Sequence, residues 1–338
     1  MNRRVKRSLQ ACVGILVALV FLYLSLRDIK ADDLWQRLKS VSLWYFFPIL
    51  LTLVAFFWIK ALRWSCLVRP LRRLSAREVL PALMIGFMGN NVLPAHLGEF
   101  VRMAVLAKQY DLSKSSVLST IVLERVLDFL AIIGLFAVTL QFIPLSEKLE
   151  VLRTVSYVIG LACVAVFVLF TVYVWQTARA IRMTERLLVV LPARLRRKLL
   201  EVLHLGVDGL RALRNPWLFL GIFGLTVVHW GINGLGLYLA AISFPLAEGL
   251  PFLAGFVLMG VTALGFTLPT APGGVGTVQG CFVLSLAIFD VEPETALAAS
   301  CYGLLMSYVP VTLVGLYFVT SLGVKIGSVT KDAEAIRS

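Results

Sequence analysis

Long runs of apolar residues, separated by short polar segments, make up most of the chain. An α-helix needs about 20 consecutive apolar residues to cross the hydrocarbon core of a bilayer. Six runs are long enough, and we expect each of them to form one full transmembrane helix. They lie at residues 8–26, 41–62, 116–142, 154–175, 216–243 and 296–322.

Two further apolar stretches, at residues 79–107 and 251–289, are interrupted by segments rich in proline and glycine. Their apolar arms are too short or too broken to be ordinary spans. Non-helical backbone at membrane depth is stable only where protein or a wet cavity surrounds it. We therefore expect each stretch to form a re-entrant helical hairpin, which enters the membrane and returns to the same side. The predicted breaks are Pro94, Gly98, Pro269 and Pro272.

The two halves of the chain, residues 8–142 and 154–322, contain the same elements in the same order. Aligning "LPAHLGEF" with "LPTAPGGVG" also aligns the spans and the aspartate-led loops that follow the hairpins. The first hairpin would enter from the cytoplasm and the second from outside, which predicts an inverted repeat with a substrate site between the hairpins. Leucine-rich membrane segments also align by chance, and the sequence alone leaves that alternative open.

The composition indicates an all-α polytopic membrane protein with a single transmembrane domain over residues 1–338. Hydrophobic residues make up 59% of the chain, charged residues 15%, and the mean hydropathy is +0.88, which is outside the range of soluble domains. The net charge of +13 comes from short basic segments, which the positive-inside rule places in the cytoplasm together with both termini. These segments suit the anionic lipid of a cytoplasmic (inner) membrane, and we expect no nucleic-acid partner.

One of these basic segments, residues 176–215, has leucines at helical spacing and a basic face. It is expected to form an amphipathic cytoplasmic helix that lies on anionic lipid. A solvated linker helix would produce the same pattern.

Three ionisable residues lie inside the predicted span at 116–142. Because a helix turns about 100° per residue, Glu124 and Asp128 lie about 40° apart and Arg125 lies about 60° from Asp128. Each such residue at the centre of a span costs about 2.5 to 3.5 kcal/mol on insertion scales, so the three must be paired. The pattern fits a buried ion-pair network that locks helices together. It also fits a site that exchanges partners with a charged lipid headgroup or a proton.

The first hairpin also carries polar residues around its break. Asn90 and Asn91 supply amide donors and acceptors at the tip, and Glu99 and Arg102 are three residues apart on the second arm, so they can pair. Capping of a kinked helix would explain the asparagines and Gly98, but not the charged pair.

In the second hairpin, free backbone N–H groups could receive an anion ahead of the next helix. These groups belong to Gly273, Gly274 and Gly276. The chain contains no G-x-x-x-x-G-K-[ST] motif, so ATP hydrolysis is not expected. The cysteines form no CxxC or Cys/His cluster, and we expect neither a metal site nor a cofactor.

Two other polar pairs have simpler interpretations. His229 and Asn233 are one turn apart in the span at 216–243, where they could line a cavity, although a hydrogen-bonded core histidine is the plainer reading. Arg63 and Trp64, at the end of the second span, are interpreted as an anchor at the membrane interface.

Three ordered motifs, "NNVLPAHLGEFVRMAVL", "VLERVLDFLAI" and "LPTAPGGVGTVQG", resemble the membrane region of the lysylphosphatidylglycerol synthase and flippase-like family of UPF0104 type. The resemblance covers essentially the whole chain. It implies a protein that moves or presents amphipathic lipids, such as aminoacylated phospholipids or polyprenyl-linked sugars. The family's motif positions fall on Asn91, Pro94, Gly98, Glu99, Arg102, Glu124, Arg125, Asp128, Pro269, Pro272, Gly273, Gly274 and Gly276.

The chain departs from the family pattern at two points. Gln279 stands where the family often has glutamate, which weakens any proton-coupling scheme that relies on a carboxylate there. In bifunctional members an aminoacyltransferase domain follows the membrane part, whereas this chain ends at "KIGSVTKDAEAIRS". It is therefore not expected to make lysyl-lipid by itself.

We expect a non-enzymatic lipid flippase in which Arg102 and Arg125 contact a phosphate. The alternative is an accessory subunit that binds an envelope or lipid biosynthesis enzyme through its basic segment. A membrane-embedded transferase fits least, because the outside loops are short and lack any histidine or cysteine set. The carboxylate pair Asp32 and Asp33 is the candidate for such chemistry, and solvation of a loop helix explains it better. The expected partners are membrane lipids. The predicted substrate-binding residues are Asn90, Asn91, Glu99, Arg102, Glu124, Arg125, Asp128, Gly273, Gly274, Gly276 and Gln279.

Overall fold

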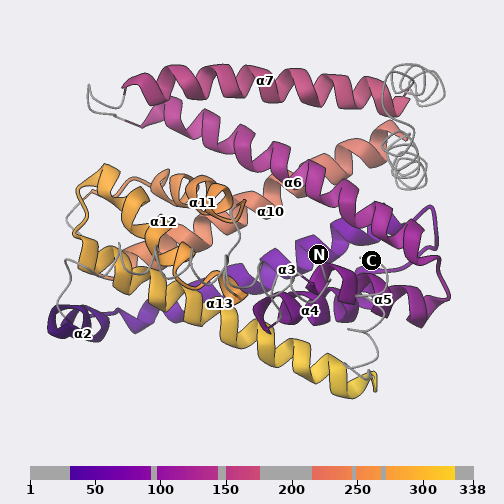
Figure 1. The fold of residues 1–338 in the computed structure, drawn as a ribbon, viewed down its shortest axis with the longest axis horizontal. Coiled ribbons are helices and arrows are strands. Elements are labelled where there is room, and N and C mark those ends of the chain that lie inside the picture. Colours follow the sequence, from indigo (N-terminus) through magenta and orange to yellow (C-terminus); the bar gives the residue numbers. More distant parts are fainter. Residues whose placement is uncertain are drawn as a thin grey trace, which may run out of the picture.

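The computed structural model describes residues 31–92, 97–143, 150–175, 215–245, 249–267 and 272–323. Over these ranges all regular structure is helical and no strand is present (Figure 1). Several predicted features lie outside the described residues. They are the span at 8–26, the basic segment 176–215 apart from Asn215, and the breaks Pro94 and Pro269.

The described chain begins with the short helix α2 (Ala31–Lys39) and the 3-10 turn η1 (Leu43–Tyr45). The first group of longer helices consists of α3 (Phe46–Val68), α4 (Ala76–Val92), α5 (Gly98–Tyr110), α6 (Lys114–Phe142) and α7 (Glu150–Trp175). The second group consists of α10 (Pro216–Ile242), α11 (Ala254–Gly265), η6 (Pro272–Gly274), α12 (Thr277–Leu286), η7 (Ala287–Phe289) and α13 (Pro293–Ser321).

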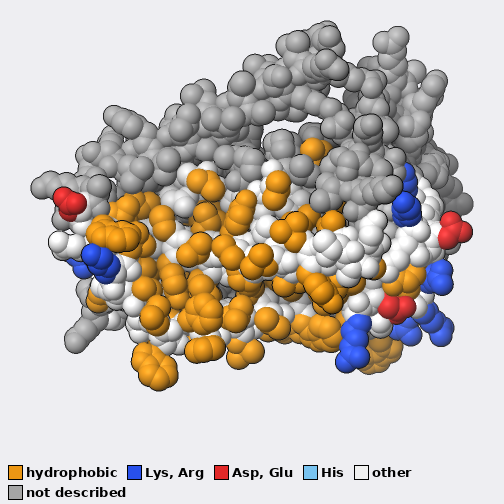
Figure 2. Space-filling view, turned by 90° about the horizontal axis from the view of Figure 1, so that it is seen from below, with side chains coloured by type: hydrophobic (Ala, Val, Ile, Leu, Met, Phe, Trp, Pro, Cys, Tyr) orange, Lys and Arg blue, Asp and Glu red, His pale blue; other side chains and the backbone are white. Residues whose placement is uncertain are grey.

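Three stretches, Leu43–Val68, Pro216–Ile242 and Pro293–Ser321, are long and apolar enough to cross a membrane by length and composition. Helix α6 has 29 residues but carries a group of charged side chains near its middle. Apolar side chains cover the middle of the face shown in Figure 2, and charged ones gather toward its two ends. A surface with this distribution suits the hydrocarbon core between two layers of headgroups.

Both interrupted stretches form helical hairpins, as the sequence predicts. Helix α4 packs along α5, and α11 packs along α12. The two arms of the first hairpin pack closely, because Gly98 has no side chain. A Cβ atom at this position would lie against the carbonyl oxygen of Gly86. The side-chain oxygen of Asn90 accepts a hydrogen bond from the N–H of Gly98 at 2.9 Å. This amide is therefore used to cap α5 within the hairpin.

Helix α4 starts with a capping interaction at the outer end of the hairpin. The backbone N–H and the hydroxyl of Ser75 both donate to the Glu78 carboxylate at 2.7 Å. These hydrogen bonds, the backbone one first, lower the pKa of Glu78 below its ordinary value. The helix start is thus stabilised above the ordinary pKa of a glutamate, and this contribution is lost as the pH falls through the lowered value.

An aspartate with left-handed backbone geometry ends each hairpin. Asp111 (φ 51°) follows α5, and Asp290 (φ 55°) follows η7; among the described residues these are the non-glycine positions with positive φ. The residue after each aspartate donates its N–H back to the last turn, at 2.9 Å for Leu112 and 3.3 Å for Val291. Aspartate tolerates this conformation better than most residues, so the two turns have the same physical basis.

The long helices pack as crossed pairs around the hairpins. Helix α3 lies along α10, α4 packs on α13, and α11 packs on α6. Helix α7 packs on α6 along one side of the molecule (Figure 1). At the other end, Arg37 of α2 forms an ion pair with Glu292 at the start of α13. The two hairpins also touch each other, because α4 packs on η6.

Candidate functional site

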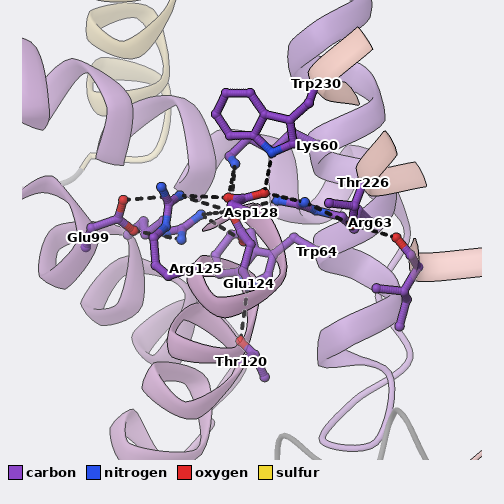
Figure 3. Close-up of polar contacts among 12 residues, drawn as sticks. Lys60, Arg63, Trp64, Glu99, Thr120, Glu124, Arg125, Asp128, Thr226 and Trp230 are labelled. Atoms are coloured by element: carbon purple, nitrogen blue, oxygen red, sulfur yellow. Dashed lines mark hydrogen bonds and ion pairs between the residues drawn. The ribbon is translucent and has the colours of Figure 1, made fainter. Parts of the chain in front are cut away.

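Seven ionisable side chains meet where α3, α5 and α6 converge (Figure 3). We call this group the charge cluster. Helix α6 supplies three of them at the spacing that the sequence predicts, so one face of the helix carries all three. The seven members of the charge cluster are Lys60, Arg63, Glu99, Arg102, Glu124, Arg125 and Asp128.

Glu124 lies at the centre of the charge cluster and is fully buried. Its carboxylate is 2.7 Å from the Lys60 ammonium and 3.3 Å from the Arg63 guanidinium. Arg102 approaches it at 3.3 Å and Arg125 at 3.1 Å. One carboxylate therefore holds four cations from three helices.

Asp128, one turn further along α6, is the second shared carboxylate. Arg63 donates a short hydrogen bond to it, and the Lys60 ammonium lies 3.5 Å away. The indole N–H of Trp230, on α10, donates to the same carboxylate at 2.9 Å. Asp128 thus links α6 to both α3 and α10.

Glu99 forms the outer edge of the charge cluster. It pairs with Arg102 at 2.7 Å and with Arg125 at 3.4 Å. The side chain of Arg125 is 44% exposed, whereas those of Arg102 and Lys60 are each 1% exposed. Arg125 is therefore the most exposed member of the charge cluster.

Aromatic rings hold the buried cations in place. The guanidinium of Arg102 lies 5.0 Å from the centre of the Trp64 ring, and the ammonium of Lys60 lies 5.5 Å from that of Phe87. The Trp64 indole in turn donates to Thr120 at 3.1 Å. Such packing over an aromatic face stabilises a desolvated cation without adding a negative charge.

The charges in the cluster do not balance. Four cationic and three anionic groups leave one net positive charge. Among the described residues, the Nε atoms of Arg63 and Arg102 have no hydrogen-bond partner. A buried group with an excess cation and spare donors favours an anion.

The predicted end of the second span is wrong, as the positions of Lys60, Arg63 and Trp64 show. The sequence places the end of this span at residue 62, with Arg63 and Trp64 as an interfacial anchor. Helix α3 instead continues to Val68, and Arg63 and Trp64 are fully buried. The helix can continue because Glu124 and Asp128 neutralise its cations, a compensation that lies on another helix.

A cavity of about 370 Å³ lies beside the charge cluster, between the two hairpins. Helices α3, α4, α10, α11, α12 and α13 all contribute to its wall, which is mostly apolar. Trp230 lines this cavity and also donates to Asp128. Phe87 likewise lines the cavity and packs on Lys60. We call it the central cavity; it shares these two side chains with the charge cluster.

Asn91 connects the first hairpin to α13. Its side-chain amide donates to the Thr312 hydroxyl at 3.0 Å, and the Tyr308 hydroxyl donates to its backbone carbonyl at 3.1 Å. Gly273 of the second hairpin packs against the Tyr308 ring, where a Cβ atom would meet the ring at 2.6 Å. Through Tyr308, the tips of the two hairpins therefore meet at the rim of the central cavity.

The glycines of the second hairpin have the backbone freedom that the sequence predicts, but not all of their N–H groups are free. Gly273, Gly274 and Gly276 have φ values of 68°, 71° and 84°. The N–H of Gly276 donates to the Gln279 side chain at 2.7 Å and so caps α12. This residue therefore does not offer the free N–H that the sequence suggests.

His229 and Asn233 have different environments. His229 is fully buried and stacks on Phe56 at 4.1 Å, but neither ring nitrogen has a hydrogen-bond partner among the described residues. The expectation of a hydrogen-bonded core histidine is thus correct for burial and wrong for the hydrogen bond. Asn233 lines the central cavity.

Two aspects of the site go beyond the sequence analysis. Lys60 is a member of the charge cluster and Trp230 donates to it, although the sequence singles out neither residue. Thr226 accepts a hydrogen bond from Arg63 at 3.1 Å. The spacing of Lys60 and Arg63, three residues apart inside an apolar run, is the signal that could have identified them. Over the described residues, no group of three or more His, Cys, Asp or Glu side chains is arranged to hold a metal ion.

Comparison with known proteins gives consistent matches. The family model for the lysylphosphatidylglycerol synthase TM region matches residues 12–315. A UPF0104 membrane protein of Methanothermobacter thermautotrophicus is 26% identical over 95% of this chain and 98% of its own length. A UPF0104 membrane protein of Methanocaldococcus jannaschii is 27% identical over 67% of this chain and 90% of its own length.

A more distant relative is named as an enzyme. The glycosyltransferase AglD of Haloferax volcanii is 25% identical over 79% of this chain, but the match covers 49% of AglD. No solved structure matches the chain.

Proposed function

This chain belongs to the lysylphosphatidylglycerol synthase TM region family, and from that premise we propose that it is a non-enzymatic lipid flippase of the cytoplasmic membrane. Its substrate is an amphipathic lipid with an anionic headgroup. The headgroup passes between the two hairpins while the acyl or isoprenoid chains stay in the bilayer. Both termini lie in the cytoplasm under this proposal, as the distribution of basic segments indicates.

The observation that carries the proposal is the excess positive charge of the buried charge cluster beside the central cavity. A network that only locked helices together would be more stable if its charges balanced, because each unpaired buried ion is costly. An anionic headgroup would supply the missing negative charge. Arg125, at 44% exposure, is placed to make the first contact with a phosphate.

The packing of the helices supports an inverted repeat, which would give the headgroup alternate access to two sides. In this scheme α3, α4, α5 and α6 correspond to α10, α11, α12 and α13. The α4–α13 contact then corresponds to the α11–α6 contact, and α3 and α10 pack on each other. The left-handed turns at Asp111 and Asp290 fall at corresponding positions. Transporters of this type bind their substrates where the two broken elements meet.

The activity of AglD is not transferred to this chain, because the match covers about half of that protein. In the relatives matched along most of their length, the names describe membrane proteins. A flippase requires no catalytic group, which is consistent with a site made of ion pairs and an apolar cavity.

Lipid exchange in proteoliposomes tests the proposal. We expect the wild-type protein to speed transbilayer exchange of a fluorescent phosphatidylglycerol above the rate in empty vesicles. Arg125→Ala should reduce the protein-dependent rate by about tenfold, since it removes a charge–phosphate contact worth about 1.5 kcal/mol.

Gln109→Leu serves as the control, because it removes an exposed amide at the outer end of α5. This variant should exchange lipid at the wild-type rate. An equal rate in empty and protein-containing vesicles, for anionic and zwitterionic lipids alike, would contradict the flippase proposal.

A further inference from the structure

The central cavity differs in chemistry from the charge cluster beside it. Among the described residues, none of the side chains that line it is a carboxylate, a histidine, a lysine or an arginine. Its polar lining consists of amides, hydroxyls and the Trp230 indole, set into an apolar and aromatic wall. The polar side chains are Thr52, Asn91, Trp230, Asn233, Thr262, Ser307 and Tyr308.

Two of these polar groups have no partner within the described protein. The hydroxyl of Thr262, on α11, is buried without a partner, and the partly buried Asn233 amide, on α10, faces the central cavity with no hydrogen bond to another described residue. Buried polar groups are nearly always hydrogen-bonded, and a group left alone costs about 1 to 3 kcal/mol. A bound ligand with hydroxyl groups would satisfy both.

We propose that the central cavity binds an uncharged, hydroxyl-bearing headgroup, so that the substrate is a phosphate ester of a polyol or a sugar. This inference rests on the proposed function and narrows its substrate class. In this proposal the charge cluster binds the phosphate of the lipid, and the central cavity binds the polyol. The Trp230 side chain is the wall that the two parts share.

Electrostatics disfavours headgroups that carry an ammonium, although the aromatic wall offsets part of the cost. A cation in the central cavity would have no carboxylate on the described lining, and the nearest charges carry a net positive charge. Desolvating a cation without a partner is strongly unfavourable. Ethanolamine and aminoacyl headgroups are therefore disfavoured, although their lipids also contain a phosphate.

The aromatic wall accommodates the carbon skeleton of a polyol. Phe56, Trp230 and Tyr308 line the central cavity from three different helices. Binding sites for small molecules commonly combine such apolar walls with a few polar groups that fix orientation. The size of the central cavity, about 370 Å³, is within the range of such sites, which is about 300 to 1,000 Å³.

Binding of short-chain lipids to the full chain in detergent tests the inference independently of transport. The probes are dioctanoyl forms of phosphatidylglycerol, phosphatidylinositol, phosphatidic acid and phosphatidylethanolamine. We expect the two polyol lipids to bind about three to ten times more tightly than phosphatidic acid, the factor that one or two net hydrogen bonds provide. Phosphatidylethanolamine should bind most weakly.

Two variants test whether the polar groups of the central cavity cause the preference for polyol lipids. Asn233→Leu and the nearly isosteric Thr262→Val should each reduce the preference for polyol lipids over phosphatidic acid by about threefold, while phosphatidic acid affinity stays at the wild-type level. Gln109→Leu is again the matched amide control and should change neither. Thr262→Val keeps the shape of its side chain, so its result does not depend on tolerance for the larger change at Asn233.

The outcomes separate this inference from the proposed function. If phosphatidic acid binds as tightly as phosphatidylglycerol, or if both variants keep the wild-type preference, the polyol assignment is wrong while an anionic-lipid site stands. If phosphatidylethanolamine binds best, or if none of the lipids binds, the polyol assignment also fails. Lipid exchange in vesicles then decides the flippase proposal separately.

Discussion

Replacing Glu124 with glutamine is expected to lower the free energy of unfolding by about 3 to 5 kcal/mol, the cost of removing one partner from a buried ion pair. The carboxylate is fully buried and lies within 3.3 Å of Lys60, Arg63 and Arg102. Its loss would raise the net charge of the cluster from one to two. Denaturant unfolding in detergent, followed by helix content, measures the change.

Lys60→Met is the informative comparison for Glu124→Gln. It removes a cation of similar burial, but it leaves three cationic and three anionic groups in the charge cluster. Glu124 keeps its contacts with three arginines, and Asp128 keeps those with two. We expect less than half of the stability loss seen for Glu124→Gln. Equal losses for the two variants would show that the excess positive charge has no energetic consequence.

The second large effect concerns the tight turn of the first hairpin. Gly98→Ala is expected to cost about 3 kcal/mol, at the upper end for overpacking. The new Cβ atom would meet the carbonyl oxygen of Gly86 and the backbone nitrogen of Asn90, neither of which can move without shifting α4. The melting temperature in detergent and the yield of monodisperse protein report this loss.

Gly224→Ala provides the control for this substitution. Gly224 lies inside α10, and a Cβ atom there would have no neighbour within 4 Å. Alanine should therefore stabilise the helix by about 0.5 to 1 kcal/mol, through its lower backbone entropy in the unfolded state. If Gly98→Ala lowered the melting temperature no more than Gly224→Ala does, the conclusion that α4 and α5 approach closely at Gly98 would be wrong.

The positions of the helices follow from the sequence because hydrophobic length is a strong signal in membrane proteins. The runs at 116–142, 154–175, 216–243 and 296–322 coincide closely with α6, α7, α10 and α13. The two interrupted stretches form hairpins because Gly98 and the glycines of the second hairpin permit close approach and positive φ. The sequence predicts the end of α3 six residues too early, since the charges of α3 are neutralised by another helix.

The candidate site was predictable only where it depends on local spacing. Helical periodicity places Glu124 and Asp128 on one face, and a separation of three residues pairs Glu99 with Arg102. Contacts between helices distant in sequence have no such signal. For this reason the sequence does not identify Lys60 and Trp230 as parts of the site. The structure also shows that Gln279 caps α12.

If the excess charge of the buried cluster holds an anionic headgroup, removing one cation should weaken the binding of an anionic lipid. The affinity of dioctanoyl phosphatidylglycerol is compared between the wild type and Lys60→Met, each folded in detergent. One unit charge at about 10 Å and an effective dielectric constant of about 20 contributes about 1.5 kcal/mol, so we predict roughly tenfold weaker binding to the variant. Unchanged affinity in a folded Lys60→Met protein would contradict the account.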